Sequence, residues 1–291
     1  MRRSLLIAAL WVAVSCTPKH PSSGPTPVPP GAPPAPPPPP PPPPSSSQAI
    51  RLGPSALRYV MHQVIHIDQQ LPTGPQQLDY GLQVFIAATV TGPADTAGYP
   101  TTITVDSMVP DSGTQLPGSI NLSAAKALSF RGRLSQKGEF RTQTISDSAA
   151  AQSLSPVLGA FKNFFPRLPV GGITLGAAWT DTTTENDRAA GSTVTSVNRV
   201  HAAAWDQRNN SRALRIETNS DFTIKGSGEQ MGQQYEVAGT GLHTGTDFLA
   251  ADGRYLGGEA RDSTSMTITL PVQSMTIPRT QVAKTTVTVL P

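Results

Sequence analysis

The 291-residue sequence contains one cysteine, Cys16, so no intramolecular disulfide can form. Aromatic residues are also scarce, at 5% of the chain. A folded core therefore has to rest on Val, Ile, Leu and Ala, together with the aliphatic part of Thr. A domain of this composition is stabilised by packing alone.

The sequence also lacks a large excess of either positive or negative charge. Lys and Arg number 22 against 19 Asp and Glu, and two of the basic residues are Arg2 and Arg3 at the start of the chain. Without these two the formal charge is +1, and residues 49–291 contain no basic run. This pattern argues against a nucleic-acid interface and against electrostatic docking to a membrane.

Motifs for common enzyme chemistry are absent as well. The sequence has no G-x-S-x-G elbow, no H-E-x-x-H and no phosphate-binding glycine loop followed by Lys and Ser or Thr. Gly239, Gly241 and Gly245 lie in a strand pattern that does not lead into a helix, so they do not form a dinucleotide loop, and bulges or close strand packing explain them. We assign no catalytic residue and no cofactor. A hydrolase assembled from distant residues stays open as an alternative.

Two groups of potential metal ligands do not fit a metal site. His62 and His66 are four residues apart, but the β-branched residues around them predict a strand, in which they lie ~13 Å apart. Asp181, Glu185 and Asp187 lack the spacing of a calcium loop. The sequence therefore predicts no metal site.

The first 16 residues have the pattern of an export signal. Arg2 and Arg3 precede a mostly apolar run, residues 4–14, which is too short to span a bilayer. Ala13-Val14-Ser15-Cys16 then resembles the lipobox of bacterial lipoproteins, although the family prefers leucine where this chain has Ala13. The resemblance implies that residues 1–15 are removed and that Cys16 becomes a lipidated first residue. The alternative is an ordinary signal peptide that leaves a free thiol.

Residues 17–48 hold 17 of the 30 prolines, which argues against a helix or a sheet. Such a segment favours polyproline II and would reach roughly 100 Å if fully extended. We expect a spacer between the anchor and a folded domain, with a ligand for proline-binding domains as the alternative. Thr17, in place of an aspartate after Cys16, resembles the pattern that sends proteobacterial lipoproteins to the outer membrane.

Residues 49–291 predict a mostly β domain, either an antiparallel curved sheet or an open barrel. Apolar and polar residues alternate within segments that turn residues separate. We expect turns at residues 206–211, 226–233 and 252–253, the last an Asp-Gly pair typical of hairpins. The expected strands lie within residues 56–68, 78–92, 99–110, 127–146, 177–187, 192–205, 213–226, 235–250, 254–270 and 281–290.

One central helix is expected near residues 155–165. Ser155-Pro156 is typical of a helix start, and Pro166 of a stop. The apolar face of this helix is a candidate core face or apolar ligand face, formed by Val157, Leu158, Phe161 and Phe165. The helix region, residues 147–166, would join two halves, 49–146 and 177–291. The shared pattern of "LSQKGEF" and "LAADGRY" leaves open whether these halves are duplicates or contain unrelated hairpins.

Leu168-Pro169, Gly176 and Trp179-Thr180-Asp181 resemble elements of uncharacterised bacterial envelope proteins, which implies a β-rich domain without a known activity. We expect a non-catalytic, membrane-anchored envelope lipoprotein with a binding or scaffolding domain. An alternative resembles the lipoprotein carriers and receptors of the periplasm, with an apolar cavity inside a curved sheet. The expected partners are the membrane, through the lipid anchor, and either another envelope protein or an acyl-chain ligand.

Overall fold

The computed structural model describes the domain that follows the proline-rich segment, together with a two-residue strand before it. The described residues are 15–16, 49–114, 121–154, 158, 164–187, 191–230 and 233–291. Val157 and Phe161 lie outside the described residues, as does the side chain of Cys16.

Strands make up most of the described chain, and helical segments are few. The strands are β1 (Ser15–Cys16), β2 (Ser55–Leu71), β3 (Gly74–Val90), β4 (Tyr99–Pro110), β5 (Ser129–Leu134), β6 (Phe140–Ile145), β7 (Ala178–Asp187), β8 (Ser192–Arg208), β9 (Ser211–Gln230), β10 (Gln233–Ala250), β11 (Tyr255–Leu270) and β12 (Met275–Val289). The short helical segments are η1 (Leu122–Ala125), α1 (Ser148–Ser153) and η3 (Pro271–Gln273).

The strands β2 to β12 form one antiparallel sheet from two meanders. The first runs from β2 outward to β6, and the second runs from β7 inward to β12. β2 and β12 pair in the middle of the sheet, from Tyr59 opposite Val289 to Gln69 opposite Arg279. The two edges are therefore β6 and β7. The short β1 pairs through Cys16 with Thr244 of β10 and Ala260 of β11.

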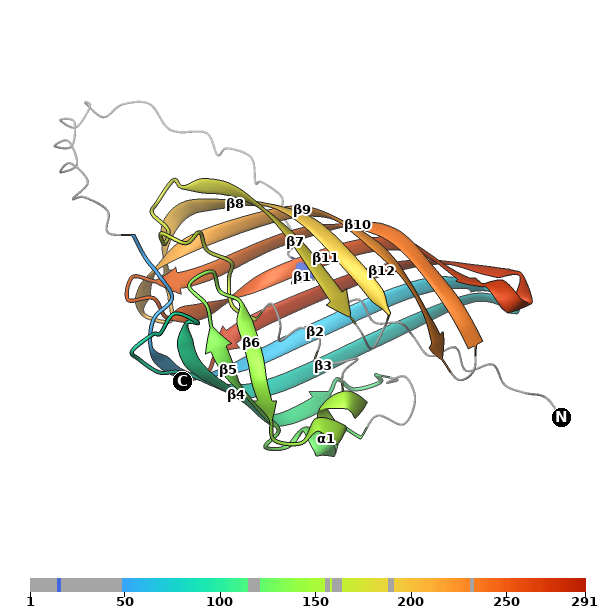
Figure 1. Ribbon diagram of the computed structural model, residues 1–291, viewed down its shortest axis with the longest axis horizontal. Coiled ribbons are helices and arrows are strands. Elements are labelled where there is room, and N and C mark those ends of the chain that lie inside the picture. The colour runs from blue at the N-terminus through green and yellow to red at the C-terminus, as the bar shows by residue number, and fades with distance from the viewer. Residues whose placement is uncertain are drawn as a thin grey trace, which may run out of the picture.

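The sheet curves strongly but does not close, as Figure 1 shows. In the described residues β6 pairs only with β5, and β7 only with β8. Buried Val84 of β3 and Leu214 of β9, on strands far apart in the sheet order, nevertheless belong to one core cluster. They can share a cluster because both line the concave side. Of the two forms expected from the sequence, the structure has the first: a curved antiparallel sheet that stays open between β6 and β7.

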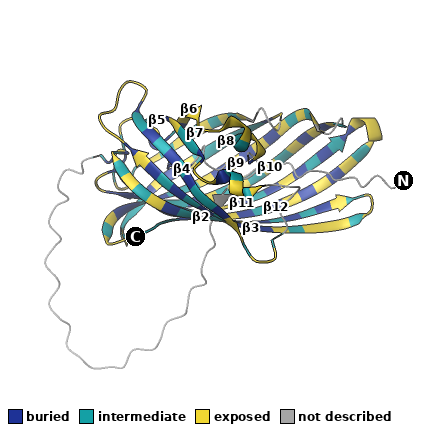
Figure 2. Cartoon of the chain, turned by 90° about the horizontal axis from the view of Figure 1, so that it is seen from below, coloured by how far each residue is buried: buried dark blue, intermediate teal, exposed yellow. Residues whose placement is uncertain are grey.

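The alternation of side chains explains why these segments form strands with one buried face. In β2, Tyr59, Met61, Gln63, Ile65 and Ile67 are buried, whereas the residues that alternate with them are half-buried or exposed. A strand places successive side chains on opposite faces, so this pattern turns one face of β2 to the concave side. Figure 2 shows the same alternation of buried and exposed residues along the long strands.

One end of the concavity, here called the filled end, is packed by the connection between β6 and β7. Leu154, Phe164, Leu168 and Ile173 of this connection are buried against the inner sides of the strands. The rings of Tyr59 and Phe164 meet edge to face, with centroids 5.1 Å apart. The apolar side chains of this connection therefore form a hydrophobic core together with the concave face of the sheet at this end.

The prediction of a helix near residues 155–165 is wrong for the last residues of that range, which are not helical. The described helix α1 lies earlier, and the Asp147 side chain caps it by accepting a hydrogen bond from the Ala150 amide at 2.9 Å. Leu158 is helical, but Phe164 and Phe165 are not. Phe165 precedes Pro166, whose ring disfavours helical backbone in the residue before it.

The expected turn at residues 226–233 is also too long. β9 continues to Gln230 and β10 begins at Gln233, so Gly226 and Gly228 lie within a strand. A Cβ on Gly228 would lie 2.6 Å from the hydroxyl of Tyr235 on the opposite strand. This glycine therefore makes room for a tyrosine across the hairpin, a contact that composition alone does not reveal.

Arg167 connects the two edges of the sheet at the filled end. Its Nη1 lies 3.2 Å from Oε1 of Glu139, beside the start of β6, and 3.3 Å from Oδ2 of Asp181 on β7. The shared guanidinium thus bridges β6 and β7, which do not pair through their backbones in the described residues. Asp181, one of the three acidic residues whose spacing does not fit a calcium loop, lies in strand β7 and pairs with Arg167.

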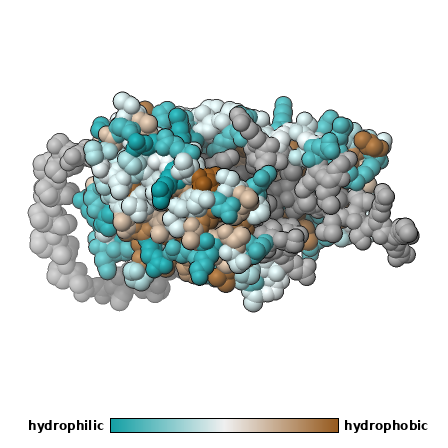
Figure 3. All heavy atoms as spheres, turned by 60° about the horizontal axis from the view of Figure 1, so that its bottom comes forward, coloured by the Kyte–Doolittle hydropathy of each residue, from teal (hydrophilic) through white to brown (hydrophobic). Residues whose placement is uncertain are grey.

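Hydrophilic side chains prevail on the face of the molecule that Figure 3 shows. Figure 3 shows hydrophobic side chains in small patches among hydrophilic ones on one face. Large apolar residues that are exposed include Val64 and Leu242, on two separate strands. In the described part of the chain no helix has the length and apolar character to cross a bilayer.

Candidate functional site: the open end of the concave face

The other end of the concavity, here called the open end, carries its own apolar cluster. Its buried members come only from β9 to β12, and none comes from the described part of the connection that packs the filled end. We call this cluster the apolar patch; it consists of Phe222, Ile224, Tyr235, Val237, Met266, Ile268, Leu270 and Ile277. A second small cluster around Ile65, Ile67 and Ala283 lies beside it on β2 and β12.

Buried polar side chains share this concave face with the apolar patch. They occupy alternate positions of β2, β11 and β12, in register with one another across the sheet. Thr264, for example, lies opposite Gln281, and Gln281 opposite Ile67. We call this group, together with the half-buried His243 of β10 that contacts Asp262, the polar cluster; its buried members are Gln63, Gln69, Asp262, Thr264, Arg279, Gln281 and Thr285.

Asp262 is the acidic residue of the polar cluster, and 1% of its surface is exposed. Its Oδ1 lies 3.3 Å from Nδ1 of His243 on the neighbouring strand, while Oδ2 has no hydrogen-bond partner. Burial raises the pKa of Asp262 well above its usual range, because the charged form loses its hydration.

Arg279 is the buried base of the same cluster, with 2% of its surface exposed. Its Nη2 donates to Oε1 of Gln281 at 2.8 Å, but Nε and Nη1 have no partner. Burial lowers the pKa of Arg279 to about 10, and the charge interaction with Tyr80 opposes this lowering. At neutral pH the guanidinium is still a cation.

Glycines on β10 allow side chains of neighbouring strands to lie over that strand. A Cβ added to Gly241 would meet the ring of Phe222. The sequence interpretation of Gly239, Gly241 and Gly245 as positions of close strand packing agrees with this contact at Gly241. The glycines thus let the apolar patch extend across β10.

The candidate residues from the sequence lie elsewhere. Leu158 and Phe165 are buried in the core of the filled end, and Phe165 lies against Phe164 with ring centroids 5.1 Å apart. Val157 and Phe161 lie outside the described residues. The structure thus places Leu158 and Phe165 in packing positions, away from the apolar patch.

His62 and His66 lie on the outer face of β2. His62 Nε2 is 2.7 Å from Oδ2 of Asp111, and His66 contacts Asp79 at 2.7 Å and Asp68 at 3.1 Å. Hydrogen bonding to Asp79 is the main cause that raises the pKa of His66. The part of the chain that the structure describes contains no group of three or more side chains arranged to hold a metal ion.

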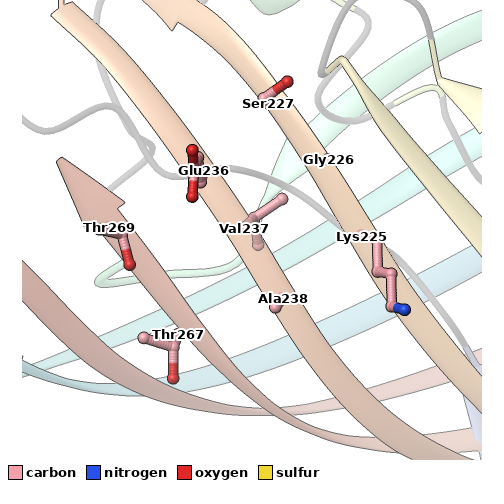
Figure 4. Close-up of a pocket in the computed structure, with 8 residues that line it drawn as sticks. All are labelled: Lys225, Gly226, Ser227, Glu236, Val237, Ala238, Thr267 and Thr269. Carbon is pink, nitrogen blue, oxygen red and sulfur yellow. The ribbon is translucent and has the colours of Figure 1, made fainter. Parts of the chain in front are cut away.

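A shallow hollow of about 410 Å³ lies on β9, β10 and β11. Figure 4 shows the residues that line it, Lys225, Gly226, Ser227, Glu236, Val237, Ala238, Thr267 and Thr269. Its lining is mostly small or polar and holds no buried unpartnered group. The open end of the concave face is therefore the stronger candidate site.

The sequence reasoning did not select the polar cluster. Strand alternation was the signal that could have found it, because in β12 the buried Arg279, Gln281 and Ala283 alternate with residues that are exposed or half-buried. A charged residue at an otherwise buried position of such a pattern is unusual. The strand predicted here began at residue 281 and so left Arg279 out.

Comparison with protein-family models and with curated protein sequences finds no match for this chain.

Proposed function

We propose that this chain is a non-catalytic, lipid-anchored envelope protein whose concave sheet face binds an amphiphile with an acyl chain. The observation that carries the proposal is the pairing of the apolar patch with buried, unpartnered polar atoms on one face of an open sheet. Ligand sites are typically apolar concavities with a few convergent polar groups. The occupant is thus expected to have both an apolar chain and a polar head.

The anchor is the second part of the proposal. The lipobox-like Ala13-Val14-Ser15-Cys16 and the proline-rich segment support a protein held at a bacterial membrane, with the outer membrane as the expected location. Two or more acyl chains anchor a protein stably. Changing Cys16→Ser is expected to release the protein from membrane fractions and to abolish lipid labelling. A variant that is still labelled and membrane-bound would refute this part.

Binding is tested with a fluorescent fatty-acid probe on the full chain carrying Cys16→Ser, so that no detergent is needed. On β9, Ile224 is fully buried in the apolar patch, whereas its neighbour Thr223 is exposed on the opposite face. Ile224→Asn is expected to weaken probe binding, and the matched control Thr223→Asn is expected to leave it unchanged. Val237→Thr is a milder change in the same patch if Ile224→Asn unfolds.

Saturable probe binding that both patch variants reduce supports the proposal. Absence of saturable binding by the parent chain refutes it. Absence of binding would instead support the competing function, a scaffold for another envelope protein.

A further inference from the structure

Arg279 is an unusual residue for its position in the sheet. It lies on the inner face of β12, opposite Gln69 of β2 and Met266 of β11. Ile277, the preceding inner residue of β12, belongs to the apolar patch. The guanidinium therefore lies at the boundary between the polar cluster and the apolar patch.

None of the described carboxylates pairs with Arg279. Asp262, the buried acid of the same face, lies opposite Ala283 of β12. Ala283 is four residues from Arg279 along the strand, so their backbones are ~13 Å apart. A buried guanidinium without a counter-charge destabilises a fold, because its lost hydration is not replaced. An unsatisfied buried group of this kind calls for a physical explanation.

We propose that Arg279 binds the anionic head group of an amphiphile whose acyl chain lies on the apolar patch, with a carboxylate or a phosphate as the head. This inference rests on the proposed function and specifies the ligand class. The two unpartnered atoms, Nε and Nη1, can donate to anionic oxygens while Nη2 keeps its bond to Gln281. The planar guanidinium suits such oxygens better than a lysine does.

The test compares amphiphiles with the same 12-carbon chain: dodecanoate, dodecyl phosphate and the neutral dodecanol. Binding is measured by displacement of the fluorescent probe from the full chain carrying Cys16→Ser, with inorganic phosphate as a separate competitor. Arg279→Met keeps much of the side-chain volume and removes the charge. Arg261→Met, at an exposed position of the adjacent strand β11, is the matched control for loss of one positive charge.

We expect Arg279→Met to weaken dodecanoate and dodecyl phosphate by about 10- to 100-fold, the effect of losing a charge-assisted hydrogen bond. Dodecanol should bind parent and variant alike, and Arg261→Met should match the parent throughout. Because Arg279→Met removes an unpaired buried charge, the variant should unfold at a urea concentration at least as high as the parent. Arg279→Lys should keep part of the preference for anionic heads.

Three other outcomes would each contradict a different part of the inference. Equal binding of dodecanoate by the parent and by Arg279→Met refutes the head-group role and leaves the proposed function standing. Inorganic phosphate that binds the parent as tightly as dodecyl phosphate points to a free-anion site. Failure of all three amphiphiles to bind the parent refutes the proposed function, and this inference with it.

Discussion

The hydroxyl of Tyr59 on β2 donates a hydrogen bond to the backbone carbonyl of Tyr255 at the start of β11, at 2.9 Å and across 196 residues of sequence. The two rings are stacked, with centroids 6.0 Å apart. The Tyr255 hydroxyl in turn donates to Oδ1 of Asp247 on β10, at 2.9 Å. This chain of contacts joins the first meander to the second inside the filled end, so the two meanders share one core.

Tyr59→Phe is expected to destabilise the domain by about 1 kcal/mol, because the Tyr255 carbonyl loses its partner while the ring still fills its space. Urea unfolding measures the change. Tyr99→Phe, at a half-buried tyrosine of β4, serves as the comparison and should cost less. Equal effects of the two changes would argue against a structural role for the Tyr59 hydroxyl.

Phe164→Ala is expected to cost about 3–5 kcal/mol of unfolding free energy, the usual range for truncating a buried phenylalanine. Phe164 is 4% exposed and contacts the rings of Tyr59 and Tyr255. Val272→Ala, at a residue 82% exposed, should change stability by no more than about 0.5 kcal/mol. A loss below 1 kcal/mol for Phe164→Ala would show that the connection does not pack firmly into the concavity.

Gly258→Ala is expected to destabilise by about 1–3 kcal/mol through overpacking. The added methyl group would lie 2.5 Å from Oδ1 of Asp247 and 2.5 Å from the carbonyl oxygen of Thr246, and the backbone atom cannot move freely. Gly171→Ala is the control, since a Cβ there meets no atom within 4 Å. Thermal unfolding of both variants measures the difference, and equal melting temperatures would contradict the prediction.

Asp247→Asn is expected to stabilise the domain at neutral pH and not at low pH. Burial raises the pKa of Asp247 from 3.8 to about 6, although the hydrogen bond from Tyr255 acts in the opposite direction. The folded state therefore binds the proton more tightly than the unfolded state. The resulting cost is absent below pH 3.8, grows as pH rises, and is complete above about pH 6.

Asparagine keeps an acceptor for the Tyr255 hydroxyl without a charge. The expected gain at pH 7.5 is about 1–3 kcal/mol, since one pKa unit corresponds to about 1.4 kcal/mol. Urea unfolding of the parent and of Asp247→Asn at pH 3.5 and pH 7.5 measures it. The same gain at both values would show that ionisation of Asp247 is not the cause.

A shortened chain that begins at Ser47 is expected to unfold as cooperatively as the full chain. The β domain uses residues from Ile50 onward: the amide of Ile50 donates to the carbonyl of Ile173 at 2.8 Å, and Ile173 donates back at 2.7 Å. A chain that begins at Ser55 lacks Ile50 and Leu52, both buried, and should be less stable by several kcal/mol. Loss of cooperativity in the longer of the two would mean that the proline-rich segment packs on the domain.

Local pattern was enough to predict the strands and several turns of this protein. Alternation in β2 and β4, and the Asp252-Gly253 pair, act within a few residues of the chain. Asn209 and Asn210 form the two-residue turn between β8 and β9, with φ of 49° and 57°, because asparagine tolerates left-handed backbone. Local signals failed at the helix, where Phe165 before Pro166 is packed as non-helical chain.

Tertiary structure decided which residues of different strands become neighbours. Alternation indicates that Arg279 and Ile277 share a face, but only register places Arg279 beside Gln69 and Met266, and Asp262 beside His243. Likewise, only the return of the second meander to the middle of the sheet puts β12 next to β2. The candidate site is built from such non-local pairs, because a curved sheet forms its inner surface from strands that are far apart in the chain.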